Sequence, residues 1–313
     1  MVATVLDRSC NHDRVEQVSL QAPAKVNLSL VIRGKREDGF HDLHTVVAAL
    51  TLHDDLQISQ SSTGGIALEC SGRTIPADDD NLVIRAAKLL ARRMGITPAI
   101  RIKLHKRIPC GAGLGGGSSD AAYCLMGLNR LWQLGLDRQQ LAEIGAELGS
   151  DVPFFLHGPV SLCTGRGERV SALPHRCRRS MVLIVTGVHV PTVQVYQRHR
   201  CQDQLVERQM RQVRYFLRVG DLDGLMIRGI NSLASTCLDL FAPLQDLHRR
   251  IDRMGLGPVC VAGSGSCLFV SADSRERAGY VAKRLGQEGI GETLVVDFEP
   301  DVETIQERQH GNY

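Results

Sequence analysis

The segment Ile108-Pro-Cys-Gly-Ala-Gly-Leu-Gly-Gly-Gly-Ser-Ser-Asp-Ala-Ala122 has five glycines in the seven positions from Gly111 to Gly117. Glycine leaves backbone N–H groups unshielded and adopts positive φ without a steric cost, so such a chain can wrap closely around an anion. The alternating residues 99–106 predict a strand before it, and residues 121–134 predict a helix after it. A helix that begins near Ser118 would add the positive end of its dipole. The segment therefore predicts a phosphate-binding loop.

Other interpretations of this loop are less consistent with the sequence. Gly111, Gly113 and Gly116 match the dinucleotide pattern G-x-G-x-x-G, but that fold needs a strand ending in Asp or Glu about 20 residues later. Asp137, near that distance, begins a predicted helix instead. The pattern G-x-x-x-x-G-K-[ST] fails because no lysine follows the glycines. A flexible linker is disfavoured because regular elements are predicted on both sides of the loop.

The composition of the whole chain is that of a globular protein. It has 313 residues, 43% of them hydrophobic and 23% charged, with a net charge of +3. This length favours two domains, and the small net charge does not indicate nucleic-acid binding. The first residues lack the apolar segment of a secretion signal, and no later apolar run is long enough to span a membrane. We therefore expect a cytoplasmic protein.

Cysteines and arginines offer two further patterns. The ten cysteines are scattered and form no Cys-x-x-Cys pair, so we expect mostly reduced thiols and no structural zinc. Arginines recur at helical spacing at positions 208, 211, 214 and 218. We interpret them as a solvated helix face, with an anionic partner as the alternative.

Hydrophobic periodicity predicts an α+β fold. Residues 18–32 and 42–59 read as strands joined by a polar loop. Residues 82–94 read as a helix with Asp80 or Asn81 as its N-cap and Gly95 at its end. Because strands and helices mix without strict alternation in both halves, α+β is favoured over a doubly wound sheet. We place a domain boundary near residue 175.

Two charged residues are candidates for chemistry at the loop. Lys25 interrupts the apolar strand Ala22-Pro-Ala-Lys-Val-Asn-Leu, where a charge is costly unless an anion compensates for it. A surface lysine at a strand edge is the simpler interpretation. Asp151 precedes Val-Pro-Phe-Phe, and an Asp in such a place is usually a helix cap. The residues alone therefore support phosphate binding and leave the acceptor of a phosphoryl group unnamed.

Three segments together resemble the ordered motifs of the GHMP small-molecule kinases. They are residues 23–27 (Pro-Ala-Lys-Val-Asn), the glycine loop 109–122, and residues 262–269 (Ala-Gly-Ser-Gly-Ser-Cys-Leu-Phe). The greatest similarity is to members acting on a cytidine diphosphate methylerythritol, and it runs from about residue 19 to 298. It implies a two-domain α+β architecture with the active site in the cleft between an ATP-binding domain, 1–175, and a second domain, 176–313. Residues 1–17 would be an extension.

The resemblance also implies roles for individual residues. Asp151 would be the base that accepts the proton of the acceptor's 2-hydroxyl, and Lys25 would keep it ionised. The ATP site would comprise Asn81 together with Pro109, Cys110, Gly111, Ala112, Gly113, Leu114, Gly115, Gly116, Gly117, Ser118 and Ser119. The acceptor site would comprise Asn27, Phe40, His41 and Tyr196, with the two aromatic rings stacked on the cytosine. ATP and Mg²⁺ are the implied cofactors, and no magnesium ligand is assigned.

The implied partners are small molecules, without nucleic acid or membrane, and the protein would be a monomer or a homodimer. The implied pathway is the non-mevalonate route to isoprenoid precursors. Two alternatives remain open from the sequence. One is a related kinase acting on mevalonate, homoserine or galactose. The other is a non-catalytic nucleotide- or RNA-binding protein with the same fold.

Overall fold

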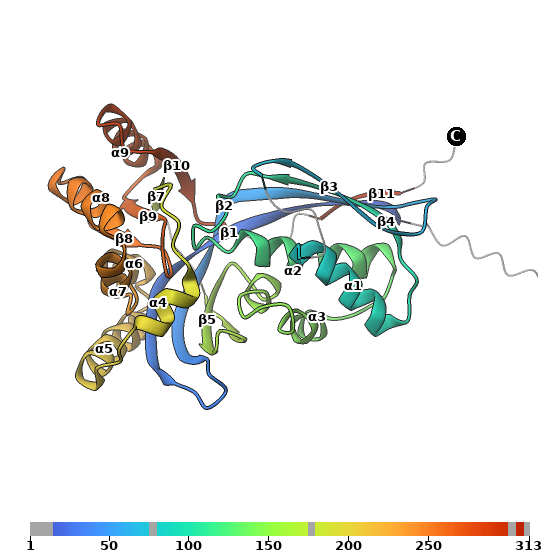
Figure 1. Ribbon diagram of the computed structural model, residues 1–313, viewed down its shortest axis with the longest axis horizontal. Helices are drawn as coiled ribbons and strands as arrows, with labels where there is room; N and C mark the ends of the chain where they lie inside the picture. The colour runs from blue at the N-terminus through green and yellow to red at the C-terminus, as the bar shows by residue number, and fades with distance from the viewer. Residues whose placement is uncertain (1–14, 75–79, 175–178, 300–304, 310–313) are drawn as a thin grey trace, which may run out of the picture.

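The computed structural model describes residues 15–74, 80–174, 179–299 and 305–309. These residues form an α+β fold, as predicted, with two β-sheets placed end to end (Figure 1). The larger sheet has seven strands in the order β11-β1-β2-β4-β3, extended by β5 on β2 and β6 on β5. Its strands are β1 (Val15–Lys35), β2 (His41–Gln60), β3 (Gly65–Gly72), β4 (Ala99–Lys106), β5 (Val160–Gly165), β6 (Arg169–Ala172) and β11 (Ile305–Gln309).

The smaller sheet has four strands in the order β10-β7-β9-β8. They are β7 (Ser180–Val185), β8 (Val259–Val261), β9 (Leu268–Ala272) and β10 (Glu292–Asp297). Strands β8 and β9 form an antiparallel pair around the turn that holds residues 262–267. This turn therefore lies at one end of the smaller sheet.

Helices cover the two sheets separately. The larger sheet carries α1 (Leu82–Met94), α2 (Gly116–Leu131), α3 (Arg138–Gly145) and the short 3-10 helix η1 (Pro153–Leu156), which lie on one face (Figure 1). Around the smaller sheet lie α4 (Thr192–Arg198), α5 (Asp203–Val219), α6 (Leu222–Arg228), α7 (Ala234–Leu240), α8 (Ala242–Arg253) and α9 (Arg275–Gln287). None of the described helices has the length and apolarity that a membrane crossing needs.

The long ribbon of β1 and β2 connects the two sheets. Its antiparallel register runs from Gln17 opposite Ser59 to Lys35 opposite His41, with three irregularities. One apolar core lies between the larger sheet and α1–α3, and another lies in the smaller sheet and its helices. A third core joins the ribbon to β7, β9, α5 and α6. The ribbon therefore sets how the glycine loop and the turn at residues 262–267 meet.

Most predicted elements are confirmed, and the clearest difference is the start of α2. The helix begins at Gly116 rather than near Ser118, so the last two loop glycines belong to its first turn. Packing against β1 and β2 explains this, because most residues of α2 are buried in spite of the poor helix propensity of glycine. The structure therefore places the helix N-terminus inside the glycine segment.

The predicted domain division stays a prediction. Residues 175–178 at its boundary lie outside the described residues, as do 1–14 of the predicted extension. The two sheets correspond broadly to the two halves of the chain. However, β11, from the end of the chain, pairs with β1 in the larger sheet.

The four arginines of the predicted helix face lie on α5 and are exposed. Tyr215 and Val219 on the same helix are also exposed, with 53% and 52% of their surface accessible. The interpretation as a solvated helix face therefore agrees with the exposure of these residues.

Candidate active site

The glycine loop connects β4 to α2 and folds through three residues with positive φ. These are Gly111, Gly113 and Gly115, at 66°, 76° and 72°, where a side chain would be strained. Gly115 is also the N-cap of α2 and provides no side-chain hydrogen bond to the first turn. The N–H groups at this helix end are therefore available to an anion.

The loop lines a cavity of about 320 Å³ together with the start of α1. Asn81, one of the two candidate caps, is the N-cap of α1; it accepts the N–H of Val83 at 2.9 Å and also lines this cavity. Residues 109–118 of the predicted ATP site line it as well. Ser119 is fully buried and lies outside the lining. The structure thus brings together the predicted nucleotide residues except Ser119.

The glycine loop packs against the turn at residues 262–267. Cys267 donates its backbone N–H to the carbonyl of Ala112 at 3.3 Å. A Cβ placed on Gly113 would lie 2.6 Å from the carbonyl oxygen of Ala262 and 2.8 Å from that of Gly265. Two motifs separated by about 150 residues of sequence therefore meet backbone to backbone at Gly113.

We expect Gly113→Ala to lower the free energy of unfolding by about 2–5 kcal/mol. About 1–2 kcal/mol comes from placing a Cβ at positive φ, and about 1–3 kcal/mol from its overlap with the two carbonyls. Denaturant unfolding measures the loss. Gly279→Ala is the matched control, because Gly279 lies on α9 with open space at its Cβ. That variant should gain about 0.5–1 kcal/mol. Equal stability of the two variants would contradict the close packing at Gly113.

Lys25 lies where the loop, the 262–267 turn and Asp151 converge. Its side chain is 7% exposed, and its Nζ donates to Asn27 Oδ1 at 2.8 Å and lies 3.8 Å from Asp151 Oδ2. Its backbone N–H donates to the carbonyl of Leu114 at 2.9 Å. A buried ammonium is thus held beside one exposed carboxylate, since the Asp151 side chain is 54% exposed. The pair can bind an anion and accept a proton.

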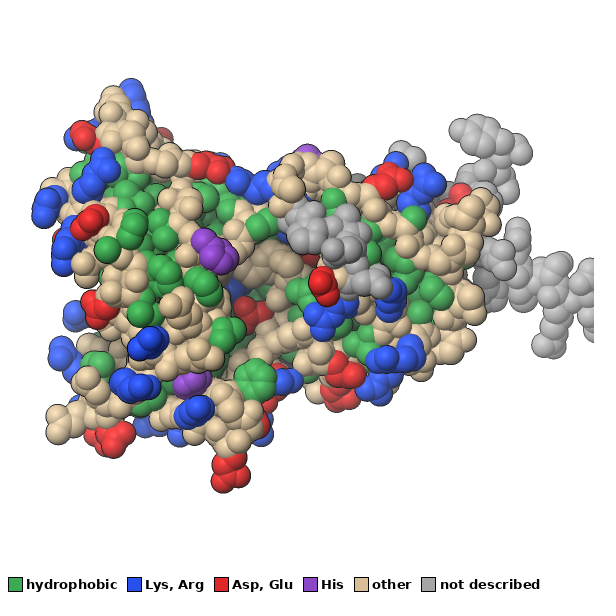
Figure 2. All heavy atoms as spheres, in the orientation of Figure 1, with side chains coloured by type: hydrophobic (Ala, Val, Ile, Leu, Met, Phe, Trp, Pro, Cys, Tyr) green, Lys and Arg blue, Asp and Glu red, His purple; other side chains and the backbone are tan. Residues whose placement is uncertain are grey.

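A narrower cavity of about 130 Å³ surrounds this pair. Its wall combines residues of the ribbon, of the glycine loop and of the smaller sheet's end, and includes Asn27, Thr45, Thr192, Tyr196, Gly263 and Ser264. Asn27 Nδ2 donates to Thr45 Oγ1 at 2.8 Å, which fixes the amide that accepts from Lys25. Figure 2 shows a hollow where the two parts of the molecule meet.

Of the four predicted acceptor residues, Asn27 and Tyr196 line this cavity, whereas Phe40 and His41 are not part of its lining. The ring of Tyr196 contacts that of His41, with centroids 5.4 Å apart and planes tilted by 47°. Phe40 is 48% exposed, and the guanidinium of Arg166 lies 5.2 Å from its ring centroid. A stacked base between Phe40 and Tyr196 stays a prediction.

Burial changes the ionisation of two of these groups. It lowers the pKa of His41 below 6.5, with a smaller contribution from the charge of Lys35, so the imidazole is neutral near pH 7. Burial, and secondarily the charge of Asp151, raises the pKa of the Tyr196 phenol. Both side chains therefore present neutral hydrogen-bonding groups.

Sequence reasoning missed several residues of the site. Thr45 and Thr192 line the inner cavity, and Lys106 and Asp120 line the outer one. Thr45 follows the predicted polar loop, and Asp120 lies within the segment 108–122, but only the fold brings these residues to the cavity walls. Among the described residues, no group of three or more His, Cys, Asp or Glu side chains could hold a metal ion.

Comparison with known proteins finds a matching family model and relatives that share one name. Residues 81–159 match the family model of the GHMP kinases N terminal domain. The chain is 36% identical to a 4-diphosphocytidyl-2-C-methyl-D-erythritol kinase of Listeria welshimeri, over 84% of this chain and 90% of the relative. It is 39% identical to the same-named protein of Bacillus pumilus, over 80% of this chain and 86% of the relative.

Solved structures agree with these relatives. A crystal structure of a 4-(cytidine 5'-diphospho)-2C-methyl-D-erythritol kinase superposes with a TM-score of 0.70 at 36% identity, covering 90% of this chain and 98% of that one. A homoserine kinase from Cytophaga hutchinsonii superposes with a TM-score of 0.72 at 18% identity, covering 97% of this chain and 100% of that one. At that identity the second match supports the fold alone.

Proposed function

The chain belongs to the family of the 4-diphosphocytidyl-2-C-methyl-D-erythritol kinases, and we propose that it carries out the following reaction at the glycine loop and the cavity around Lys25 and Asp151. ATP would transfer its γ-phosphoryl group to the 2-hydroxyl of 4-diphosphocytidyl-2-C-methyl-D-erythritol, in the non-mevalonate route to isoprenoid precursors. The observation that carries the proposal is the convergence of Lys25, Asp151 and the glycine loop at one cavity.

Asp151 would accept the proton of the attacking hydroxyl. Its carboxylate lines the inner cavity and is accessible, so an acceptor alcohol can approach it. Lys25 would keep that carboxylate ionised and stabilise the charge that develops on the transferred group. Its backbone N–H donates to the carbonyl of Leu114 in the glycine loop, so the ammonium would lie between the acceptor and the phosphates.

The outer cavity would hold ATP. Backbone N–H groups of the glycine loop and of the first turn of α2 would bind the phosphates, and Asn81 would lie near the adenine. Magnesium would enter on the nucleotide, since Mg²⁺ is commonly bound through substrate phosphates with few protein ligands. When bound, it would neutralise phosphate charge.

The inner cavity and its rim would hold the acceptor. Neutral His41 would hydrogen-bond the cytosine, and Phe40 and Tyr196 would stack on it, while Asn27 would help to position the acceptor. We expect Phe40→Ala and Tyr196→Ala each to raise the KM for the acceptor by about 5- to 150-fold, which corresponds to about 1–3 kcal/mol of stacking. Steady-state kinetics in each substrate measure this. An equal rise in the KM for ATP would place the rings outside the acceptor site.

The decisive experiment for the function is a substrate comparison. ATP consumption is measured with 4-diphosphocytidyl-2-C-methyl-D-erythritol, mevalonate, homoserine and galactose, beside the Asp151→Asn variant. We expect turnover with the cytidine compound alone. Preference for another alcohol would overturn the substrate assignment, and full activity of the variant would overturn the role of Asp151.

The proposal carries further expectations. The protein would work in the cytoplasm, where ATP is supplied, as a monomer or a homodimer, without nucleic acid. A filter-binding measurement with RNA at two salt concentrations checks the last point, because phosphate contacts would produce a steep salt dependence.

A further inference from the structure

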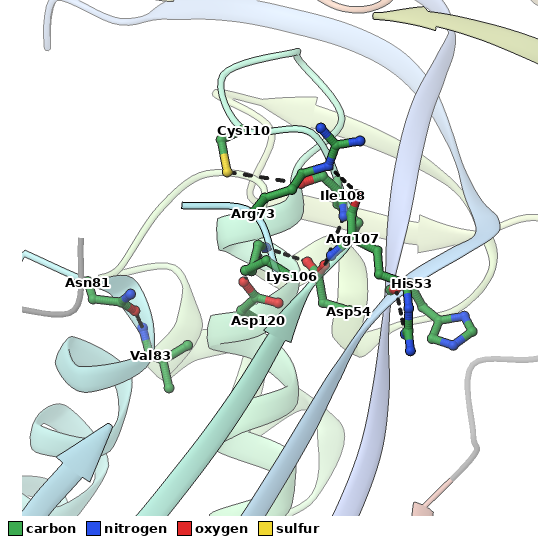
Figure 3. Close-up of polar contacts among 10 residues, drawn as sticks. All are labelled: His53, Asp54, Arg73, Asn81, Val83, Lys106, Arg107, Ile108, Cys110 and Asp120. Carbon is green, nitrogen blue, oxygen red and sulfur yellow. Dashed lines mark hydrogen bonds and ion pairs between the residues drawn. The ribbon is translucent and has the colours of Figure 1, made fainter. Parts of the chain in front are cut away.

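A buried charge cluster beneath the glycine loop is not used by the proposed mechanism. Lys106, the last residue of β4, donates from Nζ to Asp54 Oδ2 and, over 2.6 Å, to Asp120 Oδ2 (Figure 3). The three side chains are 3% exposed or less. Asp54 also accepts the backbone N–H groups of Arg107 and Ile108 at 2.6 and 2.9 Å. Asp54 therefore fixes the chain where β4 passes into the loop.

The cluster lies at the wall of the outer cavity, which both Lys106 and Asp120 line. A Cβ placed on Gly116, the first residue of α2, would lie 3.2 Å from Lys106 Nζ. The absence of a side chain at Gly116 thus allows the N-terminal backbone of α2 to rest against the ammonium. Phosphates bound at this helix end would meet the positive end of the helix dipole and the charge of Lys106 together.

Two hydrogen-bonding positions of the cluster are unused. An ammonium has three donors, and Lys106 Nζ has two acceptors among the described residues, so one N–H is available. Asp120 Oδ1 is buried without a partner in the described part of the chain. A phosphate oxygen offers acceptors only, so it can pair with Lys106 directly. It can pair with Asp120 Oδ1 only when that oxygen carries a proton.

The net charge of the cluster also requires that Asp120 carry a proton when a phosphate binds. Two ionised carboxylates around one ammonium leave the cluster with one net negative charge, which would repel a nucleotide. We propose that Lys106 is a positioning residue for the nucleotide phosphates and that Asp120 binds them as a neutral acid, so that nucleotide binding takes up a proton. Release of that proton at higher pH would weaken binding.

The surroundings of Asp120 favour its neutral form. Burial raises the pKa of Asp120 to about 7, against the lowering effect of Lys106 and with a further increase from Asp54. Burial also raises the pKa values of nearby thiols, which are therefore uncharged near neutral pH, at Cys70 on β3, Cys110 in the loop and Cys124 on α2. Asp80, before α1, lines the same cavity. The proton on Asp120 would thus be exchanged near neutral pH.

The first test measures ATP binding by titration calorimetry between pH 6 and 8.5. The affinity of the unmodified protein should fall by up to about tenfold per pH unit above the pKa of Asp120. Asp120→Asn should keep its affinity at high pH, because its amide N–H replaces the acid's O–H. The nucleotide's own ionisation is common to both proteins, so the difference between them reports on Asp120. Parallel pH profiles would overturn the proposal.

A magnesium series separates the neutral-acid role from a metal-binding role. The two proteins are compared with and without Mg²⁺. We expect the difference in pH dependence in both conditions. If Asp120→Asn weakens ATP binding only when Mg²⁺ is present, Oδ1 acts on the metal and the neutral-acid role is wrong.

The second test addresses Lys106. Lys106→Met is made in the Asp120→Asn background, because removal of the lysine alone would leave two buried carboxylates without a cation. ATP binding should weaken by about 10- to 100-fold relative to Asp120→Asn, as expected for a charge-assisted hydrogen bond. The KM for the acceptor should not change. Lys103→Met, exposed on the same strand, is the control and should bind like the unmodified protein. Equal ATP affinity of the double and single variants would overturn the role of Lys106.

This inference rests on the proposed function, because it requires that ATP binds in the outer cavity. A protein that binds no ATP would overturn both. Normal ATP binding that neither Asp120 nor Lys106 influences would overturn the inference and leave the proposed kinase activity intact.

Discussion

Asp151→Asn is expected to lower kcat by about 10²- to 10⁴-fold, the usual contribution of a general base. The substitution keeps the shape of the side chain but removes its ability to accept a proton. The carboxylate is 54% exposed and 3.8 Å from Lys25 Nζ, so we expect no large change in stability. ATP binding should persist, since the outer cavity does not include this residue.

Stopped or coupled assays of kcat, together with calorimetry of ATP binding, check this expectation. Glu143→Gln, an exposed acidic residue on α3, is the control and should alter kcat by less than about twofold. An Asn variant that keeps its rate would show that the hydroxyl loses its proton elsewhere. Loss of ATP binding in the same variant would instead indicate a structural role.

Lys25→Met should lower kcat by about 10²- to 10³-fold, the range found when one group that stabilises transition-state charge is removed. Methionine fills similar space, and the carboxylate that loses its cation, Asp151, is 54% exposed and can be solvated by water. The variant should therefore fold normally. The kinetic loss should appear in kcat more than in the KM for either substrate.

A double variant tests whether the two residues act as one unit. If Lys25 works by keeping Asp151 ionised and charge-balanced, the double variant Lys25→Met/Asp151→Asn should be about as active as the less active of the two single variants. Independent roles would multiply the two losses. Thermal unfolding serves as the control, because a drop in unfolding temperature that parallels the loss of rate would attribute the loss to stability.

Much of the fold was predictable from local pattern. The helix 82–94, its end at Gly95 and the helix start at Asp137 are found as predicted, and Asn81 is the N-cap of the first helix. These features depend on residues within one turn of each other, so neighbouring sequence contains the physical information. The start of α2 was predicted too late, because tertiary packing overcomes the low helix propensity of Gly116 and Gly117.

The candidate site was predictable in part. The glycine density indicated a phosphate loop, and family resemblance indicated Lys25 and Asp151, whose proximity the structure provides. The contact of His41 with Tyr196, and of Phe40 with Arg166, could not be read from either pattern. Each of these two contacts joins side chains that are far apart in the sequence. Neither side chain stands out from its neighbours in its own segment.

The sequence by itself determined the strand-loop-helix that is predicted to bind phosphate, because glycine content and hydrophobic periodicity act over a few neighbouring residues. Only the tertiary structure decided what surrounds that loop. The antiparallel pairing of β1 with β2 brings Asn27 to Thr45, and the packing of β4 against β2 and α2 encloses Lys106 between Asp54 and Asp120. Burial then sets the charge state of the cluster, since the cost of an unpaired charge depends on the solvent that the folded chain excludes.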